Sequence, residues 1–230
     1  MPDPLAKAQN ARNQAWALLG KRRPTRKMRL FACCCVRRVW HLLDERSRRA
    51  VAVTELYADG AASSEEKRIA ARAAGQAYQE ITDFRKVVFT PRAYTAAKAA
   101  YQTALSHRGN NWVLEVADCV QHALCFERSP TPDSGLVKAV HWEETGVTVM
   151  KEQLALIHEM FGNPVASVDK ARRWSKGIVS LASACYDGED CVFALGDALD
   201  DEDHHLVAEH FRFGSHPKGC WALDLILGKK

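Results

Sequence analysis

The residues best suited to chemistry are histidines and a cysteine in the last part of the sequence. Within seventeen residues lie His204, His205, His210, His216 and Cys220. Imidazole nitrogens and thiolate sulfurs are preferred ligands of zinc, which takes four donors in a tetrahedral arrangement. His210, His216 and Cys220 could meet if the turn-rich loop over residues 214–219 folds back. These three residues are therefore the candidate metal ligands; the sequence assigns no cofactor, and zinc is the one that would be possible.

Two other interpretations of the same residues stay open. Because no Cys-x-x-Cys pair and no second tight pair of ligands accompanies them, the histidines could belong to a polar loop in which they are structural or exposed. A catalytic pair of Cys220 with His210 or His216 would need a polarising environment that the sequence does not show. We assign no catalytic residue, and we favour a non-enzymatic protein while leaving the question of an enzyme open.

Two further groups of reactive residues are interpreted as structural. Cys33, Cys34 and Cys35 are consecutive, and neighbours on a helix point about 100° apart, so the three thiols cannot converge on one ion. Only Cys35 is expected at the centre of an apolar face. An acidic run lacks the spacing of a calcium-binding loop and is interpreted as a solvated helix end. It consists of Asp197, Asp200, Asp201 and Asp203.

Charge is distributed unevenly along the sequence. Residues 21–49 contain eleven Lys or Arg and two acids, whereas residues 187–209 contain nine Asp or Glu and no Lys or Arg. The basic block could contact nucleic-acid phosphates, or it could pair with the acidic helices. No helix-turn-helix pattern or RNA-binding signature accompanies it. The candidate nucleic-acid-binding residues are Arg22, Arg23, Arg26, Lys27, Arg29, Arg37 and Arg38.

The pattern of apolar residues predicts helices almost throughout, because strand-like alternation is nearly absent. The helix over residues 27–44 has one broad apolar face and is expected to be buried by other helices. Ser63 and Glu66 form a capping-box pattern, and Thr90-Pro91 is a second helix start. Further helices are predicted over 5–19, 45–58, 143–161, 176–186, 191–199 and 206–212. The fold class is therefore all-α, an irregular bundle of roughly eight to ten helices around a single core.

The sequence predicts one domain over residues 1–230, with residues 129–135 as a linker-like stretch that could mark an internal boundary. It contains no run of about 18 apolar residues, so no membrane span is expected. The first residues lack the pattern of a signal peptide, and a cytoplasmic location is expected by default. The eight cysteines are then expected as reduced, mostly buried thiols.

Two stretches carry a resemblance to a known family. Residues 28–60 begin with Met-Arg-Leu-Phe-Ala-Cys, and the stretch from Phe161 includes His-Pro-Lys-Gly-Cys-Trp near its end. Together they resemble an uncharacterised bacterial family, abundant in planctomycete-type genomes, with a Leu-Arg-Leu-Phe-Ala-Cys opening and a His-x-x-Gly-Cys-Trp close. The resemblance implies one all-helical domain that includes both stretches. Relatives often carry a cysteine directly after the counterpart of His210, where this chain has Phe211, and another before that helix; their absence here weakens the metal prediction.

These observations lead to three functional hypotheses. The first is a non-enzymatic helical interaction or regulatory module that binds a protein partner, with its basic N-terminal helices packed on its acidic C-terminal helices. The second is a nucleic-acid-binding protein that uses the basic face over residues 21–38. The third is a zinc-dependent protein built on His210, His216 and Cys220.

Overall fold

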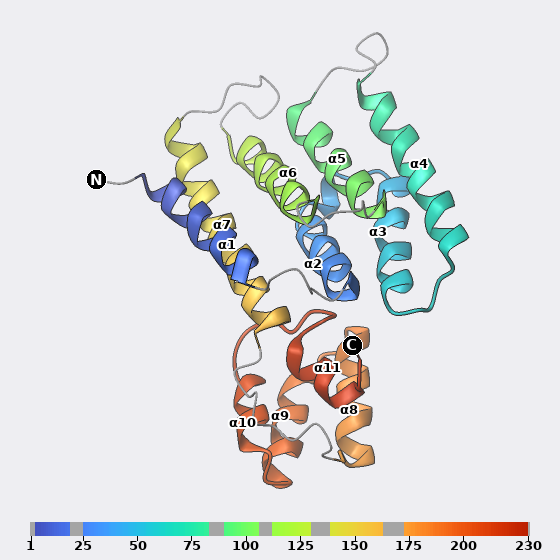
Figure 1. Cartoon of the computed structure of the whole chain (residues 1–230), viewed down its shortest axis with the longest axis vertical. Helices are drawn as coiled ribbons and strands as arrows, with labels where there is room; N and C mark the ends of the chain where they lie inside the picture. The colour runs from blue at the N-terminus through green and yellow to red at the C-terminus, as the bar shows by residue number, and fades with distance from the viewer. Residues whose placement is uncertain are drawn as a thin grey trace. The chain divides into compact units, whose positions relative to one another are not determined.

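The structure is a computed structural model that describes residues 3–18, 25–82, 90–105, 112–129, 139–162 and 173–229. Within these ranges it contains eleven α-helices and one short 3-10 helix and no strand, which confirms the all-α prediction (Figure 1). No helix in this part of the chain is both long enough and apolar enough to cross a bilayer. The contacts divide the chain into two compact units, residues 1–156 and 157–230.

The two units share one helix, α7, which begins in the first and ends in the second. The first unit contains α1 (Pro4–Leu18), α2 (Thr25–Arg37), the 3-10 helix (Trp40–Leu42), α3 (Glu45–Ala58), α4 (Ser64–Thr82), α5 (Pro91–Leu105), α6 (Trp112–Glu127) and most of α7 (Ala139–Phe161). The second contains α8 (Lys176–Asp187), α9 (Val192–Asp201), α10 (His205–His210) and α11 (Trp221–Leu227). The single-domain hypothesis stays a prediction, and the expected linker lies outside the described residues except for Ser129.

Helix α2 packs against α3, α5 and α6 in the first unit. It ends at Arg37 and is followed by the 3-10 helix, so the single helix predicted over residues 27–44 is wrong at its C-terminal end. The backbone leaves helical geometry at Val39 (φ −111°, ψ 23°), and the start of α3 also prevents a helix through residue 44, because the Asp44 carboxylate accepts a hydrogen bond from the Ser47 amide at 2.8 Å. An N-cap residue has extended backbone, and Asp44 has φ −74° and ψ 169°, so α2 cannot continue through it.

The cysteines of α2 are buried on more than one side of the helix. Cys33 and Cys35 are 0 % and 1 % exposed, and the Cys33 sulfur lies 3.8 Å from the Val51 carbonyl oxygen of α3. The expectation that only Cys35 would be central is therefore wrong, because neighbouring helices cover α2 beyond its apolar stripe. Burial raises the pKa of both thiols, that of Cys35 to about 12. These thiols are packing residues, as predicted.

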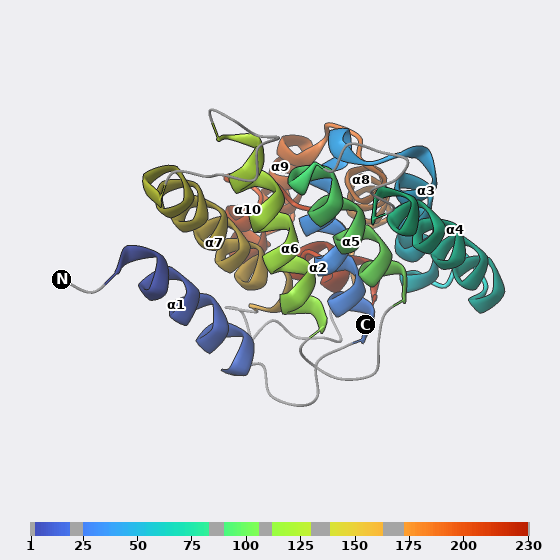
Figure 2. The ribbon, with the colours of Figure 1, turned by 90° about the horizontal axis from the view of Figure 1, so that it is seen from above.

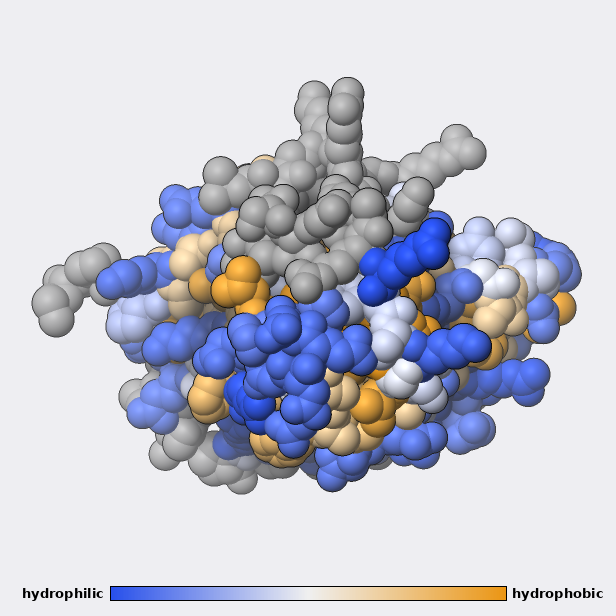
Figure 3. Space-filling model, turned by 90° about the horizontal axis from the view of Figure 1, so that it is seen from below, coloured by the Kyte–Doolittle hydropathy of each residue, from blue (hydrophilic) through white to orange (hydrophobic). Residues whose placement is uncertain are grey.

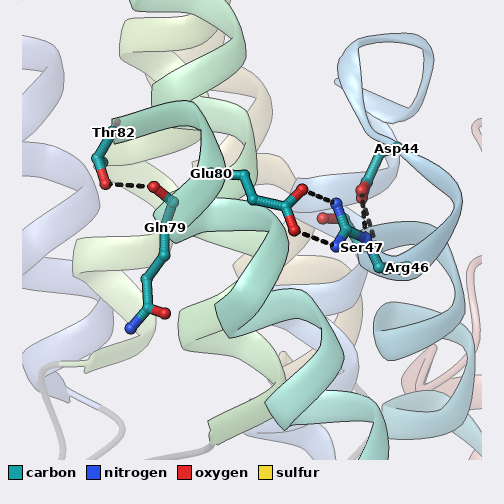
Figure 4. A network of polar contacts seen from close by, with 6 residues as sticks. All are labelled: Asp44, Arg46, Ser47, Gln79, Glu80 and Thr82. Atoms are coloured by element: carbon teal, nitrogen blue, oxygen red, sulfur yellow. Dashed lines mark hydrogen bonds and ion pairs between the residues drawn. The ribbon is translucent and has the colours of Figure 1, made fainter. Parts of the chain in front are cut away.

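Helices α4, α5 and α6 follow one another in a row (Figure 2). Helix α4 begins at the predicted capping box, in which the Glu66 amide donates to Ser63 Oγ at 3.1 Å and the Ser63 amide donates to Glu66 Oε2 at 2.7 Å. Near its other end, the Arg46 guanidinium of α3 donates to both carboxylate oxygens of Glu80 at 2.9 and 2.6 Å (Figure 4). Polar contacts thus hold α4 at both ends.

A buried arginine attaches α1 to the rest of the first unit. The Arg12 side chain is 1 % exposed, pairs with Asp118 of α6 at 2.8 Å and donates to Gln153 Oε1 of α7 at 2.7 Å. Gln153 in turn donates to the Ala117 carbonyl at 2.8 Å. A buried charge is tolerated where such partners replace its hydration. Arg12 therefore joins three helices, although no pattern in the sequence singles it out.

The second unit has a core of its own, which every helix from α8 to α11 helps to form. Its largest buried apolar side chains include Ile178, Leu195, Leu199, Phe211 and Leu223. At the start of α8, Ser175 Oγ accepts a hydrogen bond from the Ile178 amide at 3.2 Å. Gly188 caps the other end of the helix with a φ of 97°, a left-handed conformation that glycine adopts readily. This core fixes α10 and α11, which carry the candidate site.

Candidate metal centre

Four side chains of the second unit bring one donor atom each to a common point. They are Glu159, His210, His216 and Cys220, and their donor atoms all lie within 4.8 Å of one another. The three residues predicted as ligands are therefore together in the fold. Glu159 completes the set, and the sequence analysis missed it. We call these four residues the donor cluster.

The backbone of the second unit places each member of the donor cluster. Glu159 is in the last turn of α7, His210 is the last residue of α10, and Cys220 is the N-cap of α11. Between them, the Cys220 amide donates to the Pro217 carbonyl at 2.9 Å and closes a tight turn. Gly219 has φ 90° within this turn, a backbone conformation that glycine adopts without strain. The loop thus folds back, which was the condition for His210, His216 and Cys220 to meet.

Four distances between donor atoms lie near the edge length of a zinc tetrahedron. Glu159 Oε1 lies 3.1 Å from His210 Nε2 and 2.9 Å from His216 Nδ1. Cys220 Sγ lies 3.2 Å from His210 Nε2 and 3.9 Å from His216 Nδ1. Usual zinc–nitrogen, zinc–oxygen and zinc–sulfur bond lengths at tetrahedral angles separate the donors by about 3.3–3.6 Å. The four observed distances bracket this range, and all donor pairs lie within 4.8 Å of one another, so the donors would have to draw together around an ion.

The donor cluster is nearly closed to solvent. The side chains of His216, His210 and Glu159 are 1 %, 15 % and 19 % exposed, and Cys220 is fully buried. Aromatic rings form its walls, with Trp221 centred 4.7 Å from the His210 ring and Phe211 centred 4.9 Å from the His216 ring. Four protein donors in a closed pocket are typical of structural zinc sites, whereas catalytic sites keep one position open.

The electrostatics of the donor cluster favour a bound cation. Burial acts to raise the pKa of Glu159, but hydrogen bonds from His210, His216 and Cys220 outweigh it and lower this pKa to about 2. The carboxylate is therefore ionised at neutral pH. Burial and the nearby Glu159 charge raise the pKa of the Cys220 thiol, and such a thiol has to lose its proton before it can ligate a metal.

The two imidazoles also face the centre of the donor cluster. His210 Nε2 and His216 Nδ1 both face Glu159 Oε1, so each is assigned as the protonated, donating nitrogen of its ring. This orientation leaves His216 Nε2 buried and without a hydrogen-bond partner among the described residues. A cation at the centre would take the place of the protons that now point at the carboxylate.

The donor cluster does not have the properties of a cysteine nucleophile. A reactive cysteine is a thiolate with a lowered pKa in an accessible position. Cys220 is buried and the pKa of its thiol is raised, although its sulfur lies close to His210. The catalytic pair considered from the sequence therefore lacks its activated group.

The remaining histidines and acids of the region lie outside the donor cluster. His204 is 7 % exposed and its ring is centred 4.7 Å from Trp174, and the His205 side chain is 67 % exposed and pairs with Asp200. Asp197 and Asp200 both pair with Arg212, at 2.8 and 2.5 Å. The acidic run occupies the end of α9 and the turn after it, with its residues exposed or half-buried, in agreement with the interpretation as a solvated helix end.

Four residues of the basic block have partners within the first unit. Arg26 pairs with Asp59 at 2.9 Å, Arg37 pairs with Glu55 at 2.6 Å, and Arg38 pairs with Glu152. The Arg29 guanidinium lies 4.9 Å from the centre of the Tyr57 ring.

These contacts give the arginines a structural role. Lys27 lies half-buried in the first turn of α2, and Arg22 and Arg23 lie outside the described residues. Nucleic-acid binding and pairing with the acidic segment stay predictions.

The surface carries individual apolar side chains. Phe193, Leu206 and Phe213 in the second unit are 66 %, 68 % and 77 % exposed. On the face shown in Figure 3, hydrophilic side chains predominate and smaller hydrophobic areas lie between them. Single exposed apolar residues are common on protein surfaces, so the protein partner stays a prediction.

A comparison with known proteins finds no matching family model, no similar curated protein and no similar solved structure. The functional assignment therefore depends on the geometry of the donor cluster.

Proposed function

We propose that the protein is a zinc-binding helical module in which Glu159, His210, His216 and Cys220 hold one zinc ion. The observation that carries the proposal is the convergence of these four donor atoms within 4.8 Å. The ion would join the end of α7 to α10 and α11, which come much later in the sequence. Its role is structural, because all four positions of a tetrahedral ion are filled by protein.

The donor types favour zinc over other common ions. Calcium and magnesium prefer six or more oxygen ligands, and iron–sulfur clusters are held mainly by thiolates. Two imidazoles, one carboxylate and one thiolate in a compact tetrahedron suit zinc, which accepts nitrogen, oxygen and sulfur donors. Tetrahedral cobalt(II) is the spectroscopic substitute for such a site.

Metal content and thermal stability test the proposal directly. We expect the full chain, purified without chelator, to contain one zinc ion per molecule by atomic emission. Removal of zinc by a strong chelator should lower the melting temperature by roughly 10 °C, because a ligand at about a thousand times its dissociation constant stabilises the fold by about 4 kcal/mol. Added zinc should restore the original value.

Ligand variants locate the ion. H210A, H216A and C220S should each lose most of the bound zinc, whereas H205A removes an exposed histidine of the same unit and should retain it. Cobalt(II) in the wild type should show a sulfur-to-metal charge-transfer band that C220S lacks. Protein that holds no zinc, and whose melting temperature does not respond to zinc or chelator, would contradict the proposal.

A further inference from the structure

A second pair of close side chains lies in the same unit but outside the donor cluster. Cys185 is in the last turns of α8, and Cys191 is the N-cap of α9. Their sulfur atoms are 2.7 Å apart. Disulfide-bonded sulfurs are about 2.05 Å apart. The distance between these two sulfur atoms would therefore have to shorten by about 0.7 Å to reach the length of a disulfide bond.

The turn between α8 and α9 holds the two cysteines in place. The Gly188 amide donates to the Cys185 carbonyl at 3.1 Å, and the Glu189 amide donates to the Ala184 carbonyl at 3.0 Å. The Cys191 amide donates to the Glu189 carbonyl at 3.0 Å, and its sulfur also lies 3.4 Å from the Leu181 carbonyl. The backbone of the turn therefore brings the two cysteines close together.

The two thiols differ in access. Cys185 is 7 % exposed and belongs to the core of the second unit, whereas Cys191 is half-buried at its edge. Burial and the contact with Cys191 raise the pKa of Cys185 to about 12. A soluble reagent would therefore meet Cys191 first, and Cys185 would react afterwards inside the protein.

We propose that Cys185 and Cys191 form a reversible intramolecular disulfide by exchange with a small disulfide such as oxidised glutathione. Cys191 loses its proton and attacks one sulfur of the reagent, which breaks its S–S bond and releases one reduced glutathione. Cys185 then loses its proton and attacks the Cys191 sulfur, which forms the protein disulfide and releases a second reduced glutathione. The protein loses two electrons and two protons, and both pass to the reagent.

The disulfide would join the end of α8 to the start of α9 through a ring that runs from residue 185 to residue 191. Both helices pack on the core of the second unit. A cross-link restricts the unfolded chain and so favours the folded one. Oxidation should therefore raise the melting temperature of the zinc-loaded protein by several degrees.

Mass spectrometry of the full chain, purified without chelator, tests this inference. No Lys or Arg occurs between Lys176 and Arg212, so trypsin leaves both cysteines in one peptide. In an oxidising glutathione buffer, this peptide should become about 2 Da lighter, by loss of two hydrogens, and resist alkylation. In a reducing buffer it should take up two alkyl groups. A wild-type peptide that remains fully alkylated in the oxidising buffer would overturn the proposal.

Variants separate the two steps and control for folding. C185S should accumulate a mixed disulfide of glutathione at Cys191, whereas C191S should form neither the mixed nor the internal disulfide. C119S alters a buried cysteine of α6 and should leave the modification unchanged. If C185S takes up no glutathione while its circular dichroism matches that of the wild type, Cys191 is not the entry point and the proposed route is wrong.

Discussion

At the scale of single residues, Glu159 connects the chemistry of the donor cluster with the stability of the fold. Its carboxylate is mostly buried and is kept ionised by three neighbours. Each of these neighbours lies at least 51 residues further along the chain. No local pattern marks such a residue as a ligand. His210, His216 and Cys220 could be predicted because they are close in sequence and of ligand type, whereas the fourth donor needed the fold.

Glu159 should make the stability of the zinc-free protein depend on pH. Its pKa is about 2 in the folded chain, against an ordinary value of 4.5. Because the pKa of Glu159 is lower in the folded chain than in the unfolded chain, its ionised carboxylate stabilises the fold at pH values above the unfolded-state pKa. This stability is lost as the pH falls towards the folded-state pKa. The difference corresponds to about 3 kcal/mol. We expect urea denaturation to show a loss of up to that size between about pH 5 and pH 2.

The variant E159Q isolates this contribution, because an amide of similar shape does not titrate in this range. Its free energy of unfolding should fall less steeply than that of the wild type over the same interval. Equal slopes for the two proteins would show that Glu159 is not the responsible group.

Arg12 should be among the residues most important for the stability of the first unit. R12M keeps much of the aliphatic stem but leaves Gln153 and Asp118 without their cationic partner. We expect a loss of roughly 2–4 kcal/mol in the free energy of unfolding, measured with urea. R68M removes an arginine whose pair with Glu65 is exposed on both sides and should have no measurable effect. Similar effects of the two variants would contradict the role of Arg12.

At the scale of elements, the close approach of α4 and α5 depends on Gly75. A methyl group at this position would lie 2.8 Å from Cε2 of Tyr101. Tyr101 cannot easily retreat, because its ring stacks on Tyr78 with the centroids 5.9 Å apart. Alanine improves helix propensity by about 1 kcal/mol, but overpacking costs about 1–3 kcal/mol. We expect G75A to be destabilised by about 1 kcal/mol overall in urea denaturation.

The matched control for G75A is G177A, in the first turn of α8. There the nearest neighbour of the added methyl group would be Ser175 Oγ at 3.8 Å. No overpacking is expected at that distance, so the higher helix propensity of alanine should decide the change in stability. We expect G177A to be unchanged or slightly more stable. A G75A variant that is as stable as the wild type, or more stable, would mean that the approach of α4 and α5 does not require glycine.

Helix positions were largely predictable because their signals are local. The helix predicted over residues 45–58 is observed as Glu45–Ala58, and the helices that begin at Ser64 and Pro91 start where capping residues indicated. The burial of Cys33 and the end of α2 at Arg37 were predicted wrongly. Both depend on neighbours: one on the helices that cover α2, the other in part on the N-cap of the next helix. Periodicity within one segment contains neither piece of information.

At the scale of the whole molecule, the proposed ion should affect the two units unequally. All four donors lie within residues 157–230, and so does the core formed by α8 to α11. We expect removal of zinc to increase amide hydrogen exchange in peptides from residues 173–229 and to leave α3 to α5 unchanged, as measured by mass spectrometry. Equal deprotection of both regions would contradict a site confined to the second unit.

The order of the donors along the chain has a consequence for biosynthesis. Glu159 precedes His210 by 51 residues and His216 by 57. A ribosome that adds about 5–20 residues per second needs roughly 3–12 s to reach Cys220 after it has made Glu159. Until His210 is made the nascent chain offers the carboxylate alone, and the full donor set has to wait until Cys220, at the start of α11, is made.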